Sequence, residues 1–286
     1  MKRLIVSADD FGLHPAVNAA VEAAHRHGIL SSASLMVGAA ATADAVARAK
    51  RLPGLHVGLH LVLIDGRPVS PPPAVSGLVD RAGEFDRNLA RSGVRYFCLP
   101  PVRRQLATEI HAQFEAFAAT GLALDHVNAH KHLHLHPTVA GLVFRIGRQF
   151  GMTAMRVPAE PAAALRRAFP DERAAPPFYA PWVRHLRRRA RRAGIIVNDH
   201  VFGLAWSGYM VEERILRLLP HLPDVVSEIY FHPATDAAPA LGKAMPGYRP
   251  VEELAALTSA AVEARIAALG IGLTTYAALA AGDSGA

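Results

Sequence analysis

The sequence of 286 residues contains one cysteine, Cys98, and no apolar run long enough to cross a membrane. A single cysteine excludes a disulfide bond within the chain and fits a reducing compartment. Residues 1–6 lead straight into an apolar strand pattern, which leaves no room for a signal peptide. We therefore expect a cytoplasmic protein.

Charged residues are also few, at 19% of the chain, whereas hydrophobic residues make up 51%. This balance provides material for a large buried core and gives no reason to expect disorder. The length suits either one large α/β barrel or two ordinary domains.

Acidic residues are absent from the segment 184–192, which holds six arginines of a chain with a net charge of +7. Phe178, Tyr179 and Trp182 lie just before it. A basic run beside aromatic residues suits peripheral contact with an anionic membrane surface, and a solvated helix face is the open alternative. No helix-turn-helix, zinc-finger or RNP pattern occurs, so we expect no nucleic-acid partner.

Strand-length apolar runs alternate with helical patterns along the chain. The predicted strands are 4–8, 33–37, 57–63, a segment entering a histidine run at 130, 154–158, 225–231 and 271–276. The predicted helices are 15–27, 42–52, 105–119, 137–150, 212–219 and 252–269. This alternation implies a parallel sheet with crossover connections, and about seven such units indicate an α/β barrel related to the (β/α)8 type.

Two segments interrupt the alternation, namely 65–102, which is rich in proline and arginine, and 159–208. Both leave the C-terminal side of a predicted strand, where barrels build their active sites. We therefore expect inserted lids or substrate loops within a single domain spanning 1–286.

The most informative stretch is 128–137, in which His130, His132, His134 and His136 alternate with other residues. Successive strand side chains point to opposite faces, so the four histidines are expected along one edge of a strand. Imidazole is a common metal ligand, and one carboxylate with two imidazoles is a standard donor set for a catalytic divalent ion. A strand that merely happens to be rich in histidine is the open alternative.

Further polar residues stand at the ends of other predicted strands. Asp9 and Asp10 end the first, His60 lies in the third, and His232 follows 225–231. In a parallel barrel these ends converge on one mouth. Asp10, His60 and His130 would then hold one divalent ion, with zinc the first choice and magnesium or another divalent ion as alternatives.

Adjacent side chains diverge, so Asp9 is predicted to act as a general base beside the metal and not as a ligand. His232 would protonate the leaving group, and Glu228, four residues earlier on the same strand, would orient that imidazole. One strand seldom gives three ligands to one ion. His132 and His134 are therefore expected to support the ligands or to contact substrate.

Four motifs occur in an order that resembles the YdjC-type carbohydrate deacetylases. They are Ala-Asp-Asp-Phe-Gly at 8–12, Val-Gly-Leu-His-Leu at 57–61, the histidine run with the following Pro137, and His232-Pro233. The resemblance spans nearly the whole chain. It implies a distorted (β/α) barrel and a metal-dependent hydrolase that removes N-acetyl groups from sugars by cleaving a linear amide bond.

The resemblance implies the ligand, base and acid roles just described for the same five residues, and it matches Arg156 to a substrate-side arginine. The family often reads Asp-Ser-His-His-His where this chain has Asn-Ala-His-Lys-His at 128–132. The departure places Lys131 close to the expected metal mouth.

The segments 124–132 and 93–97 are similar to the hopanoid-biosynthesis-associated branch of that family. This similarity implies deacetylation of an N-acetylglucosaminyl hopanoid lipid at the inner face of the cytoplasmic membrane, where the basic insert would reach its substrate.

Other interpretations stay open. They are a deacetylase of soluble chito-oligosaccharides, a histidine-rich barrel phosphoesterase or amidohydrolase, and a non-catalytic, metal-dependent lipid-binding protein. The phosphoesterase class commonly has an early His-x-His pair at a strand end, whereas the early strand here ends in Asp9-Asp10; His25-Arg26-His27 lies in the predicted helix 15–27. The sequence also leaves a homodimer open.

Overall fold

The computed structural model describes residues 2–172 and 179–282, so Phe178 of the aromatic segment lies outside the described residues. Its central element is a parallel sheet in the order β6-β5-β4-β3-β2-β1-β8-β7, with β9 also paired to β1. The strands are β1 (Arg3–Phe11), β2 (Ser32–Leu35), β3 (His56–Leu61), β4 (Val127–Ala129), β5 (Ala154–Met155), β6 (Ile196–Val197), β7 (His200–Phe202), β8 (Val226–Phe231) and β9 (Gly272–Leu273).

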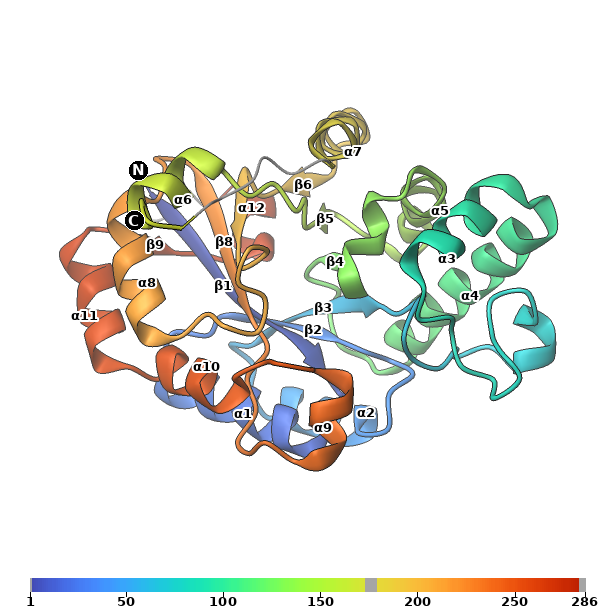
Figure 1. Ribbon diagram of the computed structural model, residues 1–286, viewed down its shortest axis with the longest axis horizontal. Helices are drawn as coiled ribbons and strands as arrows, with labels where there is room; N and C mark the ends of the chain where they lie inside the picture. Colours follow the sequence, from blue (N-terminus) through green and yellow to red (C-terminus); the bar gives the residue numbers. More distant parts are fainter. Residues whose placement is uncertain (1, 173–178, 283–286) are drawn as a thin grey trace.

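The sheet curls into a half-barrel with helices around it (Figure 1), which confirms the predicted single-domain TIM-like α/β class. β6 and β7 stand at opposite ends of the hydrogen-bonded order but are separated in sequence only by Asn198 and Asp199. The chain itself therefore joins the two edge strands of the sheet by a two-residue connection.

The helices that surround the sheet are α1 (Pro15–His27), α2 (Thr42–Ala49), α3 (Leu89–Cys98), α4 (Pro100–Ala119), α5 (Pro137–Gly147), α6 (Ala162–Ala168), α7 (Ala180–Arg192), α8 (Glu212–Leu218), α9 (Pro239–Ala244), α10 (Pro250–Leu257), α11 (Ala260–Ala268) and α12 (Tyr276–Ala280). Short 3₁₀ turns are η1 (Pro72–Val75), η2 (His130–Leu135), η3 (Arg148–Phe150) and η4 (Leu219–His221). Several helices begin with proline, including α1, α5 and α10. Proline suits the first helical turn because the backbone N–H that it lacks would have no hydrogen-bond partner there.

Two sequence predictions need correction. The single helix predicted over 252–269 is two helices, α10 and α11, because the side chain of Ser259 accepts the N–H of Val262 and caps a new helix. The segment 159–208 is not only an inserted loop, since it supplies α6, α7 and the strands β6 and β7 of the sheet. The segment 65–102 carries η1, α3 and the start of α4.

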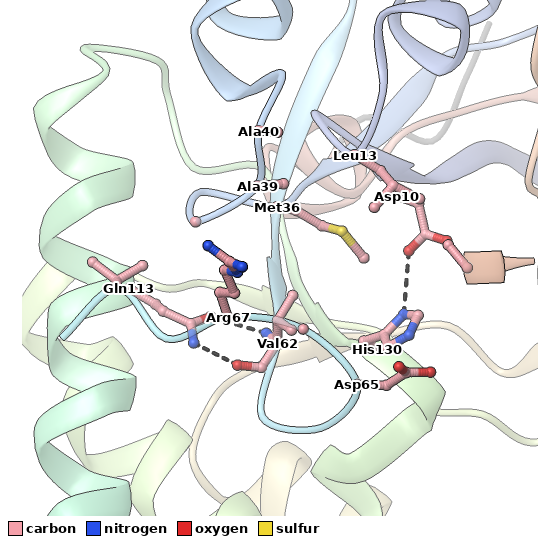
Figure 2. Close-up of a pocket in the computed structure, with 14 residues that line it drawn as sticks. Asp10, Leu13, Met36, Ala39, Ala40, Val62, Asp65, Arg67, Gln113 and His130 are labelled. Atoms are coloured by element: carbon pink, nitrogen blue, oxygen red, sulfur yellow. Dashed lines mark hydrogen bonds and ion pairs between the residues drawn. The ribbon is translucent and has the colours of Figure 1, made fainter. Parts of the chain in front are cut away.

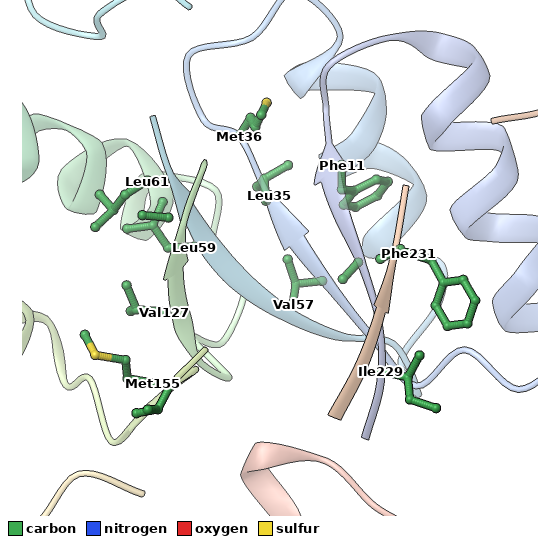
Figure 3. Packing of buried hydrophobic residues seen from close by; sticks show 14 of the residues in the cluster. Phe11, Leu35, Met36, Val57, Leu59, Leu61, Val127, Met155, Ile229 and Phe231 are labelled. Carbon is green, nitrogen blue, oxygen red and sulfur yellow. The ribbon is translucent and has the colours of Figure 1, made fainter. Parts of the chain in front are cut away.

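The core lies between the sheet and its helices. Apolar residues of neighbouring strands, such as Leu35, Val57, Val127 and Ile229, pack side by side (Figure 3) and are almost fully buried. Strands buried on both faces are typical of parallel sheets. Against this background the polar residues in the same strands stand out, and they are buried as well. They are Ser7, Asp9, Asp10, Ser32, Ser34, His60, Asn128, Ser227 and Glu228.

No helix in the described parts of the chain is long and apolar enough to cross a membrane.

Candidate metal centre and catalytic site

Three strands bring together the residues that the sequence predicts as metal ligands. Asp10 lies near the end of β1, His60 lies in β3, and His130 follows β4 directly. The Oδ1 atom of Asp10 is 3.2 Å from Nε2 of His60 and 3.2 Å from Nδ1 of His130. Figure 2 shows the Asp10 and His130 side chains pointing toward one another.

The donor atoms of these three residues all lie within 4.8 Å of one another, close enough to share one ion. Asp10 Oδ1 and His60 Nε2 are buried and have no hydrogen-bond partner among the described residues. Buried polar atoms without partners are rare, and a cation between them would satisfy both. One carboxylate and two imidazoles suit zinc better than magnesium, which prefers oxygen ligands. The residues therefore fit a divalent ion.

The backbone of β1 is distorted where it delivers these groups. Its register against β2 shifts between Ala8 and Phe11, and Asp10 has a left-handed φ of 60°. Such a conformation is costly for a residue other than glycine and tends to persist at functional sites. The distortion allows the side chains of both Asp9 and Asp10 to line one cavity, although an undistorted strand would send them to opposite faces.

Asp9 is held by Arg156 through a two-pronged ion pair. The Nη1 atom of Arg156 donates to Asp9 Oδ2 at 2.6 Å and its Nη2 donates to Asp9 Oδ1 at 2.9 Å. Burial alone would raise the pKa of Asp9, but the charge and hydrogen bonds of Arg156, with contributions from His60 and His232, hold that pKa well below its ordinary value. Asp9 is thus kept ionised at physiological pH.

Arg156 and Glu228 lie behind Asp9 and do not line the catalytic cavity. Their positions differ from the sequence predictions, in which Arg156 contacts substrate and Glu228 orients His232. Both are fully buried. Glu228 accepts hydrogen bonds from Arg156 Nη2 at 2.8 Å, from Ser7 Oγ at 2.6 Å and from the Tyr276 hydroxyl at 2.8 Å. The four-residue spacing to His232 misled because β8 ends at Phe231, so the strand alternation does not reach the histidine. These contacts indicate that both residues position Asp9.

Asn128, which the sequence marked only as a departure from the family pattern, connects the base to a ligand. Its Oδ1 accepts from Nδ1 of His60 at 2.6 Å, which leaves the Nε2 lone pair of His60 facing Asp10. Its Nδ2 donates to Asp9 Oδ1 at 3.1 Å and to Ser34 Oγ at 2.8 Å. A carboxylate here could accept from His60 but could not donate to Asp9.

His232 lies on the cavity with its ring between two tyrosines, at centroid distances of 5.5 Å from Tyr230 and 4.9 Å from Tyr248. Burial lowers the pKa of His232, against the charges of Asp10 and Asp9, which raise it. Its backbone N–H donates to the buried carboxylate of Glu253, a residue that no pattern in the sequence indicates. Glu253 fixes the backbone that carries this histidine.

The prediction that four histidines share one strand edge is wrong. β4 ends at Ala129, and the following residues form η2, in which Lys131 and His132 have left-handed φ angles of 51° and 54°. His130 therefore enters the metal site, whereas His132 lies on the cavity wall with Nε2 3.2 Å from the Tyr230 hydroxyl. His134 is fully buried, and burial lowers its pKa to about 3.

Three cavities meet around this centre. The catalytic cavity, of about 470 Å³, is lined by the metal-site residues with Asp9, His132 and His232. A smaller cavity of about 220 Å³ adjoins Asp10 and His130 and is lined mainly by apolar side chains (Figure 2). An apolar pocket of about 400 Å³ shares Lys131, His132 and Leu204 with the catalytic cavity. A substrate with an apolar portion could therefore extend from one into the other.

Comparison with known proteins gives one family and several named carbohydrate deacetylases that resemble this chain. The family model described as YdjC-like protein matches residues 3–268. A carbohydrate deacetylase of Brevibacillus brevis is 30% identical over 279 residues, which covers 97% of this chain and 99% of that protein. A chitooligosaccharide deacetylase of an Enterobacter species is 37% identical over 160 residues, covering 54% of this chain and 59% of the other.

A candidate cellobiose-phosphate cleavage protein of Enterococcus faecalis V583, known from a crystal structure, has a similar fold. It superposes with a TM-score of 0.75 at 24% sequence identity and covers 97% of this chain and 98% of its own. This likeness supports the fold.

Proposed function

This chain belongs to the YdjC-like protein family, and from that premise we propose that it is a metal-dependent hydrolase that deacetylates an N-acetylated carbohydrate. The reaction would cleave a linear amide C–N bond with water and give acetate and a free amine. The observation that carries this proposal is the cluster of Asp10, His60 and His130 with the ionised Asp9 beside it in one cavity.

A divalent ion bound by this cluster would polarise the acetyl carbonyl and acidify a water molecule. Side chains of the protein would accept and donate the protons. Asp9, oriented by Arg156 and Asn128, would accept the proton that the attacking water loses. His232, on the wall of the same cavity, would deliver a proton to the departing amine nitrogen. Burial lowers the pKa of His232, so the proton that Asp9 takes from water would have to pass to His232 before the next turnover.

We propose zinc as the ion, because two of its three protein ligands would be imidazoles. Metal analysis of the purified protein should then find one zinc per chain. Two or three ions per chain would instead favour the phosphoesterase or amidohydrolase class.

For the substrate we propose an N-acetylglucosaminyl hopanoid lipid. The support is the apolar pocket that shares part of its lining with the catalytic cavity, since a sugar in the latter would leave its apolar aglycone beside Trp182 and Leu135. A soluble chito-oligosaccharide is the second candidate, favoured by the name of the Enterobacter relative.

The test is acetate release from the hopanoid glycolipid and from a chito-oligosaccharide, with and without a chelator. Chelator-sensitive release that zinc restores is expected for the glycolipid. Trp182→Ala should slow the lipid reaction and leave the sugar reaction unchanged, because Trp182 lines only the apolar pocket. Turnover of the sugar alone would refute the lipid assignment and keep the deacetylase.

The variant Asp9→Asn distinguishes a deacetylase from a non-catalytic lipid-binding protein. This variant should bind zinc as the wild type does, since Asp9 is not among the clustered ligands, yet it should release no acetate. If neither the wild type nor the variant releases acetate from either substrate while both bind the glycolipid, the protein is a binding protein.

A further inference from the structure

An arginine-lined groove runs between α5 and α7, away from the catalytic residues. Its volume is about 590 Å³, and its lining includes Arg145 of α5, Arg148 of η3, and Arg189 and Arg192 of α7. No acidic residue lines it. None of the four arginines forms an ion pair with a carboxylate within residues 2–172 and 179–282.

One of these arginines is seated in the groove. The guanidinium of Arg189 stacks over the ring of Phe144 at 5.4 Å, and it lies beside Gly141, where a side chain would come within 3.6 Å of it. Four like charges in one groove repel one another, and the planar guanidinium fork is well matched to phosphate oxygens. The groove is therefore suited to phosphate-bearing anions.

Exposed apolar side chains lie on α7 itself and on α3, which contacts α5. Trp182, on the first turn of α7, is 47% exposed, and α3 presents Leu89, Val94 and Phe97 at 47%, 64% and 55% exposure. α5 contacts both α3 and α7, and in Figure 1 α3 and α5 lie on the side away from the chain termini, with α7 nearer the middle. Leu89 and Trp182 also line the apolar pocket that shares Lys131, His132 and Leu204 with the catalytic cavity.

We propose that this docking face, defined as the α5–α7 arginine groove with Leu89, Val94, Phe97 and Trp182, binds the surface of an anionic phospholipid bilayer. Lipid phosphates would enter the groove, and the apolar side chains would sit among the headgroups. Stable binding at a bilayer surface requires both the basic groove and the exposed apolar side chains, since neither alone suffices. Aliphatic residues such as Leu89 and Val94 cannot stack on bases, which favours a bilayer over a nucleic acid.

The docking face can be tested without any substrate, so the result does not depend on the proposed deacetylase function. The full-length protein is sedimented with vesicles of phosphatidylcholine alone or of equal parts phosphatidylcholine and phosphatidylglycerol. Binding to the anionic vesicles only, weakened by salt, is expected. Arg145→Ser/Arg148→Ser should lower the partition coefficient roughly thirtyfold, the factor that follows from losing two arginines near an anionic surface.

The matched control is Arg166→Ser/Arg167→Ser, which removes two exposed arginines from α6 and should leave binding within about twofold of wild type, since α6 lies outside the docking face. Val94→Ser/Phe97→Ser should weaken the binding that persists in high salt. Unchanged thermal melts and unchanged far-UV circular dichroism would show that each variant is folded.

Three results would overturn the proposal. They are equal binding to neutral and anionic vesicles, an equal loss in the α6 control, and binding to single-stranded RNA without binding to vesicles. A protein that binds anionic vesicles as expected but releases no acetate would leave the docking face intact and refute only the proposed function.

Discussion

Replacing Arg156 with methionine is the most informative single change, because it separates the positioning of Asp9 from the metal site itself. Methionine keeps much of the buried volume of arginine and removes its charge. The variant leaves two carboxylates, Asp9 and Glu228, buried without their shared cation.

The magnitude follows from that burial. Breaking a buried ion pair by removing one partner costs about 3–5 kcal/mol of unfolding free energy. Two carboxylates lose their partner here, but the hydroxyls of Ser7 and Tyr276 and the amide of Asn128 still donate to them. We therefore expect about 4 kcal/mol. For a chain of this size that corresponds to a fall in Tm of roughly 7 °C.

The penalty should depend on pH in a defined direction. Arg156 holds the pKa of Asp9 below its ordinary value in the folded protein. The stability that this pair contributes is therefore present at neutral pH and is lost as pH falls toward the lowered pKa. In the variant the unpaired carboxylates can take up protons, so the difference in Tm between variant and wild type should narrow as pH falls from 7 to about 4.

Thermal melts followed by circular dichroism at several pH values measure both effects. Arg26→Met is the control, because Arg26 forms a half-exposed pair with Glu22 at 2.9 Å, and loss of such a pair should cost no more than about 1 kcal/mol. Adding Glu228→Gln to Arg156→Met removes one of the two unpaired charges and should recover part of the loss. A fall in Tm no larger than that of Arg26→Met, or one that is independent of pH, would refute the reasoning.

Two further predictions concern the neighbours of the site. Asn128→Leu removes the acceptor of His60 Nδ1 and should weaken zinc affinity roughly 10–100-fold in a chelator competition, whereas Asn128→Asp keeps that acceptor and should bind zinc as the wild type does. Burial raises the pKa of Glu253 from 4.5 to about 7. The contribution of Glu253 to the stability of the wild type should therefore fall by about 3 kcal/mol as pH rises from 4.5 to 7. Glu253→Gln should flatten this dependence on pH and the exposed Glu263→Gln should not, and an unchanged dependence in Glu253→Gln would contradict the assignment.

The parts of the site that could be predicted from the sequence are those that strand topology alone determines. Asp10, His60 and His130 stand at the ends of three strands, and parallel strands that alternate with helices bring those ends to one edge. The strands β6 and β7 could not be predicted in this way, because two and three residues are too few to show an alternating pattern.

The supporting residues could not be predicted for a different reason. Arg156 is 147 residues from Asp9 and Asn128 is 68 residues from His60 in the chain. Their pairing depends on the register of β1, β3, β4 and β5 and on a bulge in β1, none of which leaves a local signal. An arginine after a strand reads equally well as a substrate contact or as a buried counter-ion, and burial alone distinguishes the two.

The histidine run shows how a correct ligand can follow from an incorrect geometry. In an extended strand His130 and His132 would project from one face about 6.8 Å apart, and the pattern would give no reason to choose between them. The left-handed turn at Lys131 and His132 makes that choice, at a cost of roughly 1–2 kcal/mol for each residue. Lys131 Nζ bonded to Asp65 and His132 bonded to the Tyr230 hydroxyl help to offset the cost. Because both contacts come from other strands and loops, the turn that delivers His130 to the metal site is imposed by the folded barrel and not by the local sequence.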